Sequence, residues 1–143
     1  MATIFDVAKY ILEKSGPMTA MKLQKLAYYS QAWSLVWDEE PLFNEEFQAW
    51  ANGPVCSELY NEHRGQFKVD ESQFSGNSKA LTENQKDSID KVLSFYGSKT
   101  AQWLSDLTHR ESPWLDTRDG LPLMAKCNYV IPKAAMHEYY SSL

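Results

Sequence analysis

The sequence has little of what builds disulfide frameworks, metal centres or membrane spans. Its two cysteines, Cys56 and Cys127, lie far apart, with no CxxC pair and no histidine pair at ligand spacing. We therefore expect reduced thiols and no bound metal or cofactor. The longest apolar run, AWSLVW at 32–37, is too short to cross a bilayer, and no basic, then apolar, leader opens the chain. These absences predict a cytoplasmic protein without membrane contact.

Positive charge is scarcer than negative charge. The 143 residues include 14 Lys and Arg against 19 Asp and Glu, a net charge of −5 at pH 7. No general field therefore attracts nucleic acid or anionic lipid. The apolar share of 43% is enough for a buried core, and no repeat or linker divides the chain. We predict one domain spanning residues 1–143.

Apolar residues at helical spacing predict a mainly α fold of about six helices. Thr3 with Asp6, and Thr82 with Gln85, have the spacing of capping boxes. In the long second helix the apolar residues form one stripe, so we expect it to be central to the core. The predicted helices lie between Thr3 and Gly16, from Thr19 to about 37, over 54–64, from Thr82 to Gly97, around 103–107, and from Pro132 onward.

Strand-like sequence is confined to two short segments, FQAW at 47–50 and NYVI at 128–131. Both are rich in aromatic or β-branched residues and precede a proline, so they could pair as a small two-stranded element. Residues 65–81 mix Gly, Ser, Asn and charge without a period, which predicts a long surface loop.

The dipeptide Gly53-Pro54 predicts a sharp change of chain direction. Glycine tolerates the positive φ of a strand-to-helix corner, and proline suits the first turn of a helix. We expect this joint to let Trp50 pack inward. In a second interpretation the free N–H groups at this helix start receive an anion or a partner's carboxylate.

Three motifs together resemble the SocA-like Panacea antitoxin domain family. They are MTAMKLQKLAYYSQAW at 18–33, EPLFNEEFQAWANGPVCSELY at 40–60 and THRESPW at 108–114, in that order and spacing. The resemblance covers the chain from about Thr19 to Tyr140. It implies a helical, non-enzymatic antitoxin, encoded on mobile elements or prophages beside a toxin gene, that binds and neutralises that toxin. Some relatives resemble adaptors that deliver a toxin to a protease, which makes a cellular protease a second candidate partner.

Aromatic residues support a protein-binding role independently of the resemblance. The chain has 5 Trp, 8 Tyr and 6 Phe, more than one small core needs, and surplus Trp and Tyr are typical of interfaces. From the motifs we assign the partner-binding surface to six residues: Trp50, Gly53, Pro54, Tyr60, His109 and Trp114.

Two other functions remain open from the sequence. His109, Arg110 and Glu111 lie near Asp116, a combination that could support a hydrolase or a nucleotide-processing enzyme. Alternatively, they end one helix and begin the next turn, which is the interpretation we prefer.

A DNA-binding regulator is the remaining hypothesis. Lys22, Lys25 and Tyr29 fall on one face of the long helix, and a basic, aromatic face can bind a phosphate backbone. Because the chain is acidic, we expect these side chains instead to be solvated, or paired with an acidic partner surface. His63 and His137 lack a partner at metal-ligand spacing, so both are predicted on helix surfaces.

Overall fold

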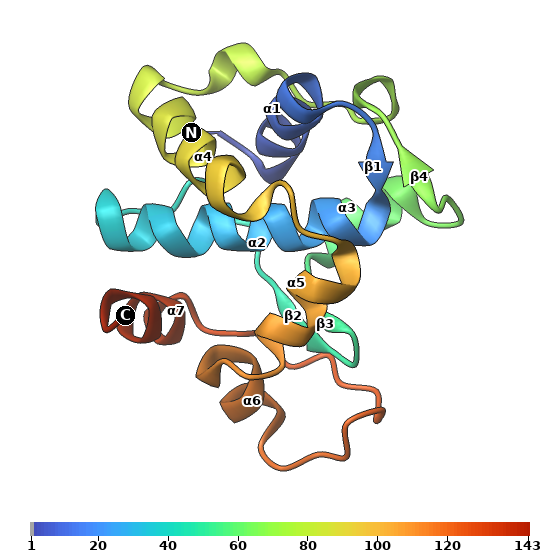
Figure 1. Ribbon diagram of the computed structural model, residues 1–143, viewed down its shortest axis with the longest axis vertical. Coiled ribbons are helices and arrows are strands. Elements are labelled where there is room, and N and C mark those ends of the chain that lie inside the picture. The colour runs from blue at the N-terminus through green and yellow to red at the C-terminus, as the bar shows by residue number, and fades with distance from the viewer. Residues whose placement is uncertain (1) are drawn as a thin grey trace.

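The computed structural model describes residues 2–143, and helices make up most of that range. They pack around one long helix, with two small antiparallel sheets beside it (Figure 1). Within the described residues none of these helices is both long and apolar enough to cross a membrane. The helices are α1 (Ile4–Ser15), α2 (Ala20–Trp37), α3 (Ser57–His63), α4 (Glu83–Tyr96), α5 (Ala101–Thr108), α6 (Ser112–Arg118) and α7 (Lys133–Ser141), and the strands are β1 (Met18–Thr19), β2 (Gln48–Trp50), β3 (Gly53–Val55) and β4 (Lys68–Val69).

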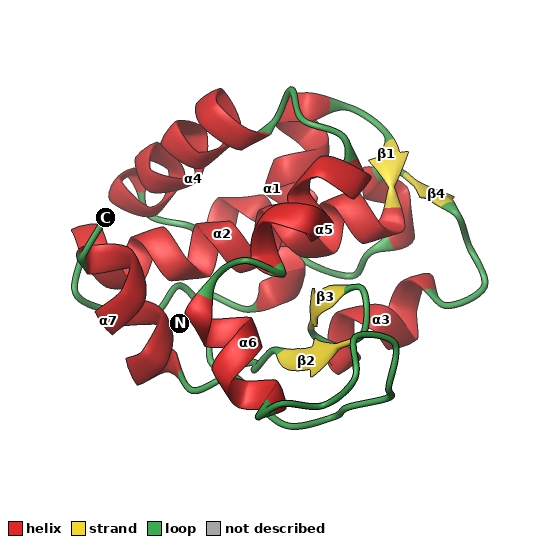
Figure 2. Cartoon of the chain, turned by 60° about the horizontal axis from the view of Figure 1, so that its bottom comes forward, coloured by secondary structure: helices red, strands yellow, loops and turns green. Residues whose placement is uncertain are grey.

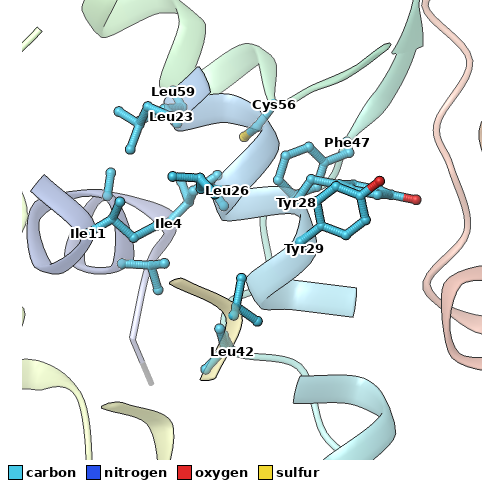
Figure 3. Packing of buried hydrophobic residues seen from close by; sticks show 14 of the residues in the cluster. Ile4, Ile11, Leu23, Leu26, Tyr28, Tyr29, Leu42, Phe47, Cys56 and Leu59 are labelled. Carbon is cyan, nitrogen blue, oxygen red and sulfur yellow. The ribbon is translucent and has the colours of Figure 1, made fainter. Parts of the chain in front are cut away.

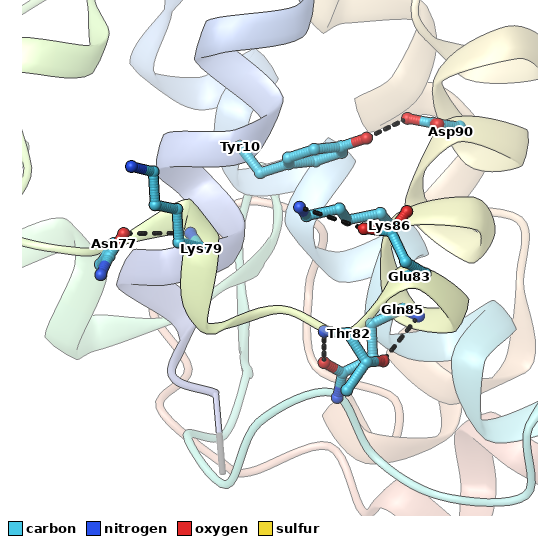
Figure 4. A network of polar contacts seen from close by, with 8 residues as sticks. All are labelled: Tyr10, Asn77, Lys79, Thr82, Glu83, Gln85, Lys86 and Asp90. Carbon is cyan, nitrogen blue, oxygen red and sulfur yellow. Dashed lines mark hydrogen bonds and ion pairs between the residues drawn. The ribbon is translucent and has the colours of Figure 1, made fainter.

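The helix starts follow from capping residues that the sequence contains. Both predicted capping boxes are present: Thr3 exchanges hydrogen bonds with Asp6 before α1, and Thr82 with Gln85 before α4 (Figure 4). Each box satisfies backbone N–H groups that have no partner inside the helix. The prediction of a mainly helical fold is confirmed, with α6 as a seventh helix after Ser112.

Helix α2 runs through the middle of the molecule, and α1, α4, α5 and α7 all pack on it (Figure 1). Thirteen of its 18 residues are buried, and they lie on every side of the helix. The predicted single apolar stripe therefore describes only part of its surroundings. Its polar residues Gln24, Lys25 and Gln31 are also buried, so each needs a partner from another element.

The core joins α1 to α2 through aliphatic side chains and α2 to α7 through aromatic ones. Ile4 and Ile11 face Leu23 and Leu26, whereas Tyr28 and Tyr29 form the aromatic side (Figure 3). The ring of Tyr29 stacks on Tyr96 with a centroid distance of 4.2 Å. Many of the aromatic residues that we expected at an interface thus fill the core.

The Gly53-Pro54 dipeptide lies in a β-hairpin and not at a strand-to-helix corner. β2 pairs with β3, with Trp50 opposite Gly53. Gly53 has the predicted positive φ, at +117°. The prediction for Pro54 was wrong: it lies inside β3, and α3 begins three residues later, at Ser57. Edge-strand positions suit proline because its missing N–H leaves no donor without a partner.

The segment 128–131 joins this hairpin only loosely. One isolated bridge links Gln48 to Val130, and Ile131 N–H donates to Phe47 O. The two predicted strand segments do meet, but the fuller pairing is within 48–55. Residues 65–81 also differ from the predicted surface loop, because β4 pairs with β1, and Val69 and Phe74 are buried.

Candidate functional site

Side chains from three helices hold the carbonyl groups of the β2–β3 hairpin. Arg118 donates to Ala49 O at 2.9 Å, and Trp114 donates to Trp50 O at 2.8 Å. On the other strand Lys25 Nζ donates to Pro54 O at 3.2 Å. Two further donors complete the set, Ser105 Oγ to Asn52 O and Gln24 Nε2 to Cys56 O. Five carbonyl groups over eight residues are thus bound from outside the hairpin.

These contacts leave the hairpin no free edge for a partner strand. Ala49 is opposite Pro54, and the outward groups of both are occupied: Ala49 N–H donates to Tyr129 O at 2.9 Å, and Pro54 has no N–H. A partner cannot extend this sheet by adding a strand, which requires unpaired backbone groups. Recognition here must use side chains.

Position 53 requires glycine for two reasons: its φ is positive, and side chains of α2 and α5 lie close to its backbone. A Cβ on Gly53 would lie 2.6 Å from Lys25 Cε and 2.9 Å from Thr108 Oγ1. The absence of a side chain allows α2 and α5 to contact the hairpin backbone directly.

Trp114 connects the hairpin to α6. Its ring stacks on His109 at a centroid distance of 4.2 Å, and the Arg118 guanidinium lies 4.8 Å from the same ring. Burial lowers the pKa of His109. Only 2% of Trp114 is exposed, and the ring lies behind the hairpin.

Arg118 also shapes the loop between α6 and α7. Its Nη2 donates to Pro122 O at 2.8 Å, Leu123 O at 3.1 Å and Ala125 O at 2.8 Å. With the loop backbone gathered around this buried guanidinium, apolar side chains of 121–130 project outward. Those that are markedly exposed are Leu121, Leu123, Met124, Tyr129 and Val130.

A groove of about 780 Å³ lies between this loop and the hairpin. Figure 2 shows the loop passing beside β2 and β3. The Trp50 and Tyr60 rings meet edge to face in its wall, with centroids 5.0 Å apart. The lining is Met21, Gln48, Trp50, Ala51, Asn52, Tyr60, Leu121, Lys126, Cys127, Asn128 and Tyr129.

The six residues predicted to bind a partner all belong to this region, but in two roles. Trp50 and Tyr60 line the groove, and Trp50 is only half-buried instead of packed inward. Gly53, Pro54 and Trp114 are buried behind it, and His109 is half-buried against Trp114. The loop residues 121–129 were missed, because only their position beside the hairpin marks them.

Lys25 contradicts the expectation of solvated lysines on α2. Only 1% of it is exposed, and burial lowers its pKa to about 7. Tyr29 is fully buried, and Lys22 is half-buried, with Nζ donating to Gly97 O at 2.7 Å. Of the basic, aromatic face proposed for DNA binding, only Lys22 therefore reaches the surface.

Glu111 lies in a buried tyrosine cluster. Its Oε1 accepts hydrogen bonds from Tyr29 at 2.8 Å and from Tyr140 at 2.6 Å. Burial raises the pKa of this carboxyl group, although both hydroxyls oppose the shift. Neither Glu111 nor His109 lines the groove, and no hydrogen bond joins them. The structure does not bring together the acid and base that the hydrolase hypothesis needs.

The other two histidines occupy different environments. The surface prediction was wrong for His63, which is buried beside Gln24, with 3.0 Å between His63 Nε2 and Gln24 Nε2. His137 lies at the surface of α7 and contacts Glu39 at 2.9 Å. Within residues 2–143 no group of three or more His, Cys, Asp or Glu side chains could hold a metal ion.

A protein-family model matches the part of the chain that forms the hairpin side of this site. The family is described as "Antitoxin SocA-like, Panacea domain", and its match spans residues 23–115. The matched range includes Gln24, Lys25, the whole hairpin and Trp114. Searches of curated proteins and of solved structures found no match.

Proposed function

Because the chain belongs to the SocA-like Panacea antitoxin family, which is generally non-enzymatic, we propose that it neutralises a cognate protein toxin by direct binding. The groove between the hairpin and residues 121–129 is the contact surface in this proposal. The toxin is the product of an adjacent gene, residues 1–143 act as one domain, and neutralisation is steric and uses no cofactor.

The observation that carries the proposal is an exposed apolar surface built on a rigid support. Leu121 and Tyr129, which are 39% and 60% exposed, line the groove together with the Trp50 and Tyr60 rings, and Leu123 and Met124, 58% and 72% exposed, lie on the same loop. Large contiguous apolar surface on a soluble chain marks interaction sites. The bound hairpin carbonyls keep this surface in one conformation, so little conformational entropy is lost on binding.

The test is co-expression with the neighbouring toxin, read by growth and by co-purification. Leu121→Asp and Tyr129→Asp place a charge in the groove lining without touching the core, so we expect both to lower toxin affinity by at least tenfold and to abolish rescue. Phe67→Asp is the matched control, because Phe67 is 82% exposed but lies at the β4 end of the molecule. It should rescue growth like the wild type.

Two results would contradict the proposal. Rescue that survives both loop substitutions would place the contact surface elsewhere. Rescue without any stable complex would favour a chemical or regulatory mechanism over steric neutralisation. Thermal melts of each variant check that loss of rescue is not loss of folding.

A further inference from the structure

A second, smaller pocket of about 200 Å³ adjoins the groove. Two of its lining residues, Met21 and Asn52, also line the groove. The others are Lys25, Ala101, Gln102 and Ser105, from α2 and α5. A segment that occupies the groove could therefore place one side chain in this pocket.

Lys25 is the charged group of the pocket, and it lacks an anionic partner. Within residues 2–143 its Nζ has one acceptor, Pro54 O, although an ammonium group carries three N–H donors. No carboxylate of the described chain lies within ion-pair distance. Buried lysines are normally paired, because an isolated buried charge is costly. Burial lowers the pKa of Lys25 to about 7.

The neighbouring polar groups favour an acceptor as the ligand. The Ser105 hydroxyl and the Gln102 amide already donate, to Asn52 O and to Asp106 Oδ1 respectively. Donors therefore remain on Lys25 and on the exposed Asn52 side chain, and the Gln102 amide keeps one unused N–H. A carboxylate matches these donors, and charge-assisted hydrogen bonds are stronger than neutral ones.

We propose that the pocket over Lys25 binds a carboxylate, supplied by an acidic side chain of the toxin segment that occupies the adjoining groove. The proposal rests on the proposed function for the identity of the partner, but not for the chemistry of the pocket. Apolar contacts in the groove hold the segment, and the Lys25–carboxylate pair selects its register.

The pocket chemistry is tested with sodium acetate, with sodium chloride at equal ionic strength as the control. At pH 6.5 we expect saturable shifts of the Asn52 side-chain amide resonances in ¹⁵N-labelled protein. Lys25→Met should abolish them. Gln102→Glu should also abolish them, since its carboxylate would compete for Lys25, and this exposed position keeps the fold intact. Gln102→Ala should retain them.

Absence of saturable shifts, or equal shifts in Gln102→Glu and Gln102→Ala, would overturn the carboxylate site. Neither result depends on a toxin, so the pocket chemistry is tested even if the proposed function is wrong.

The partner is tested with the purified toxin. Lys25→Met should weaken binding by about tenfold or more, the factor that corresponds to one charge-assisted hydrogen bond. Lys22→Met is the matched control: it removes a lysine of the same helix that also donates to a backbone carbonyl, outside the pocket. Equal affinity of the two variants would overturn the toxin as the source of the carboxylate. A wild-type protein that binds acetate but no toxin would contradict the proposed function alone.

Discussion

Glu111 and Lys25 are both buried and ionisable, yet their surroundings differ. Lys25 lies on α2, and Glu111 contacts Tyr29 of the same helix. Two tyrosine hydroxyls donate to the Glu111 carboxylate, whereas Lys25 has a single carbonyl acceptor. Burial shifts the pKa of each toward its neutral form, upward for Glu111 and downward for Lys25. The tyrosine cluster is complete within the chain, and Lys25 lies beside an open pocket. A buried group with its partners in place stabilises the fold, whereas one without them indicates a binding site.

The largest effect is expected where the Lys25 region is most tightly packed. Gly53→Val would introduce a β-branched side chain at φ +117° and force Lys25 and Thr108 aside. We expect a loss of about 3 kcal/mol or more in the free energy of unfolding. Urea denaturation measures it, with Gly65→Val as control: Gly65 also has positive φ, but no atom lies within 4 Å of its Cβ position. Equal losses would show that φ alone matters.

The second-largest loss of stability is expected from substitutions of Glu111 in the tyrosine cluster. Glu111→Ala would leave the Tyr29 hydroxyl without an acceptor, whereas Tyr140 would keep the Tyr28 hydroxyl as a partner, so we expect a cost of about 1–3 kcal/mol, the range for one buried unsatisfied group. Glu111→Gln keeps one acceptor oxygen and should cost less. Thermal and urea melts compare the two. If Glu111→Ala were harmless, the cluster would not be the stabilising region that the comparison requires.

Lys25 should make the free energy of unfolding depend on pH. Its folded pKa, about 7, lies below the unfolded value, so between pH 7 and 10 the unfolded state binds more protons and stability rises with pH. Relative to Lys25→Met, the wild type should gain up to about 1.4 kcal/mol per pH unit from pH 7 to 8.5. His63 and His109, which also face this region, are retained in both proteins. A constant difference across this range would mean that Lys25 titrates normally.

The smallest effect is expected from a substitution of Pro54, whose carbonyl group accepts the hydrogen bond from Lys25. Pro54→Ala keeps the carbonyl but adds an N–H on the side of β3 that faces away from β2, where the residue is buried. We expect a cost of about 1–2 kcal/mol for an unsatisfied buried donor. Val55→Ala, on the same strand, is the comparison for lost packing. A neutral Pro54→Ala in urea melts would indicate that the new N–H finds a partner.

Local signals predicted the elements of this fold well. Thr3 with Asp6 and Thr82 with Gln85 cap helices where their spacing indicates, because a capping box depends on residues within one turn. The predicted end of the second helix, at about residue 37, is also confirmed, at Trp37. Pro54 was misassigned, since proline suits an edge strand as well as a first helical turn, and local sequence does not distinguish them.

The candidate site could be predicted only in part. Trp50 and Tyr60 were found from the motif, and both line the groove. Lys25 was predicted to be solvated because the chain is acidic, but its burial comes from the hairpin, more than 20 residues later in sequence. Residues 121–129, which form one side of the groove, match no sequence motif. Their conformation depends on hydrogen bonds from Arg118.

By itself, the sequence determined the helical class, the helix caps, the positive φ of Gly53 and membership of an antitoxin family, all of which depend on neighbouring residues or on motif order. Tertiary structure alone decided which polar residues are buried and which apolar ones are exposed. Burial of Lys25 and Glu111, and exposure of Leu123 and Tyr129, depend on packing between elements that lie far apart along the chain. That packing forms the groove between the β2–β3 hairpin and the loop whose carbonyl groups Arg118 binds.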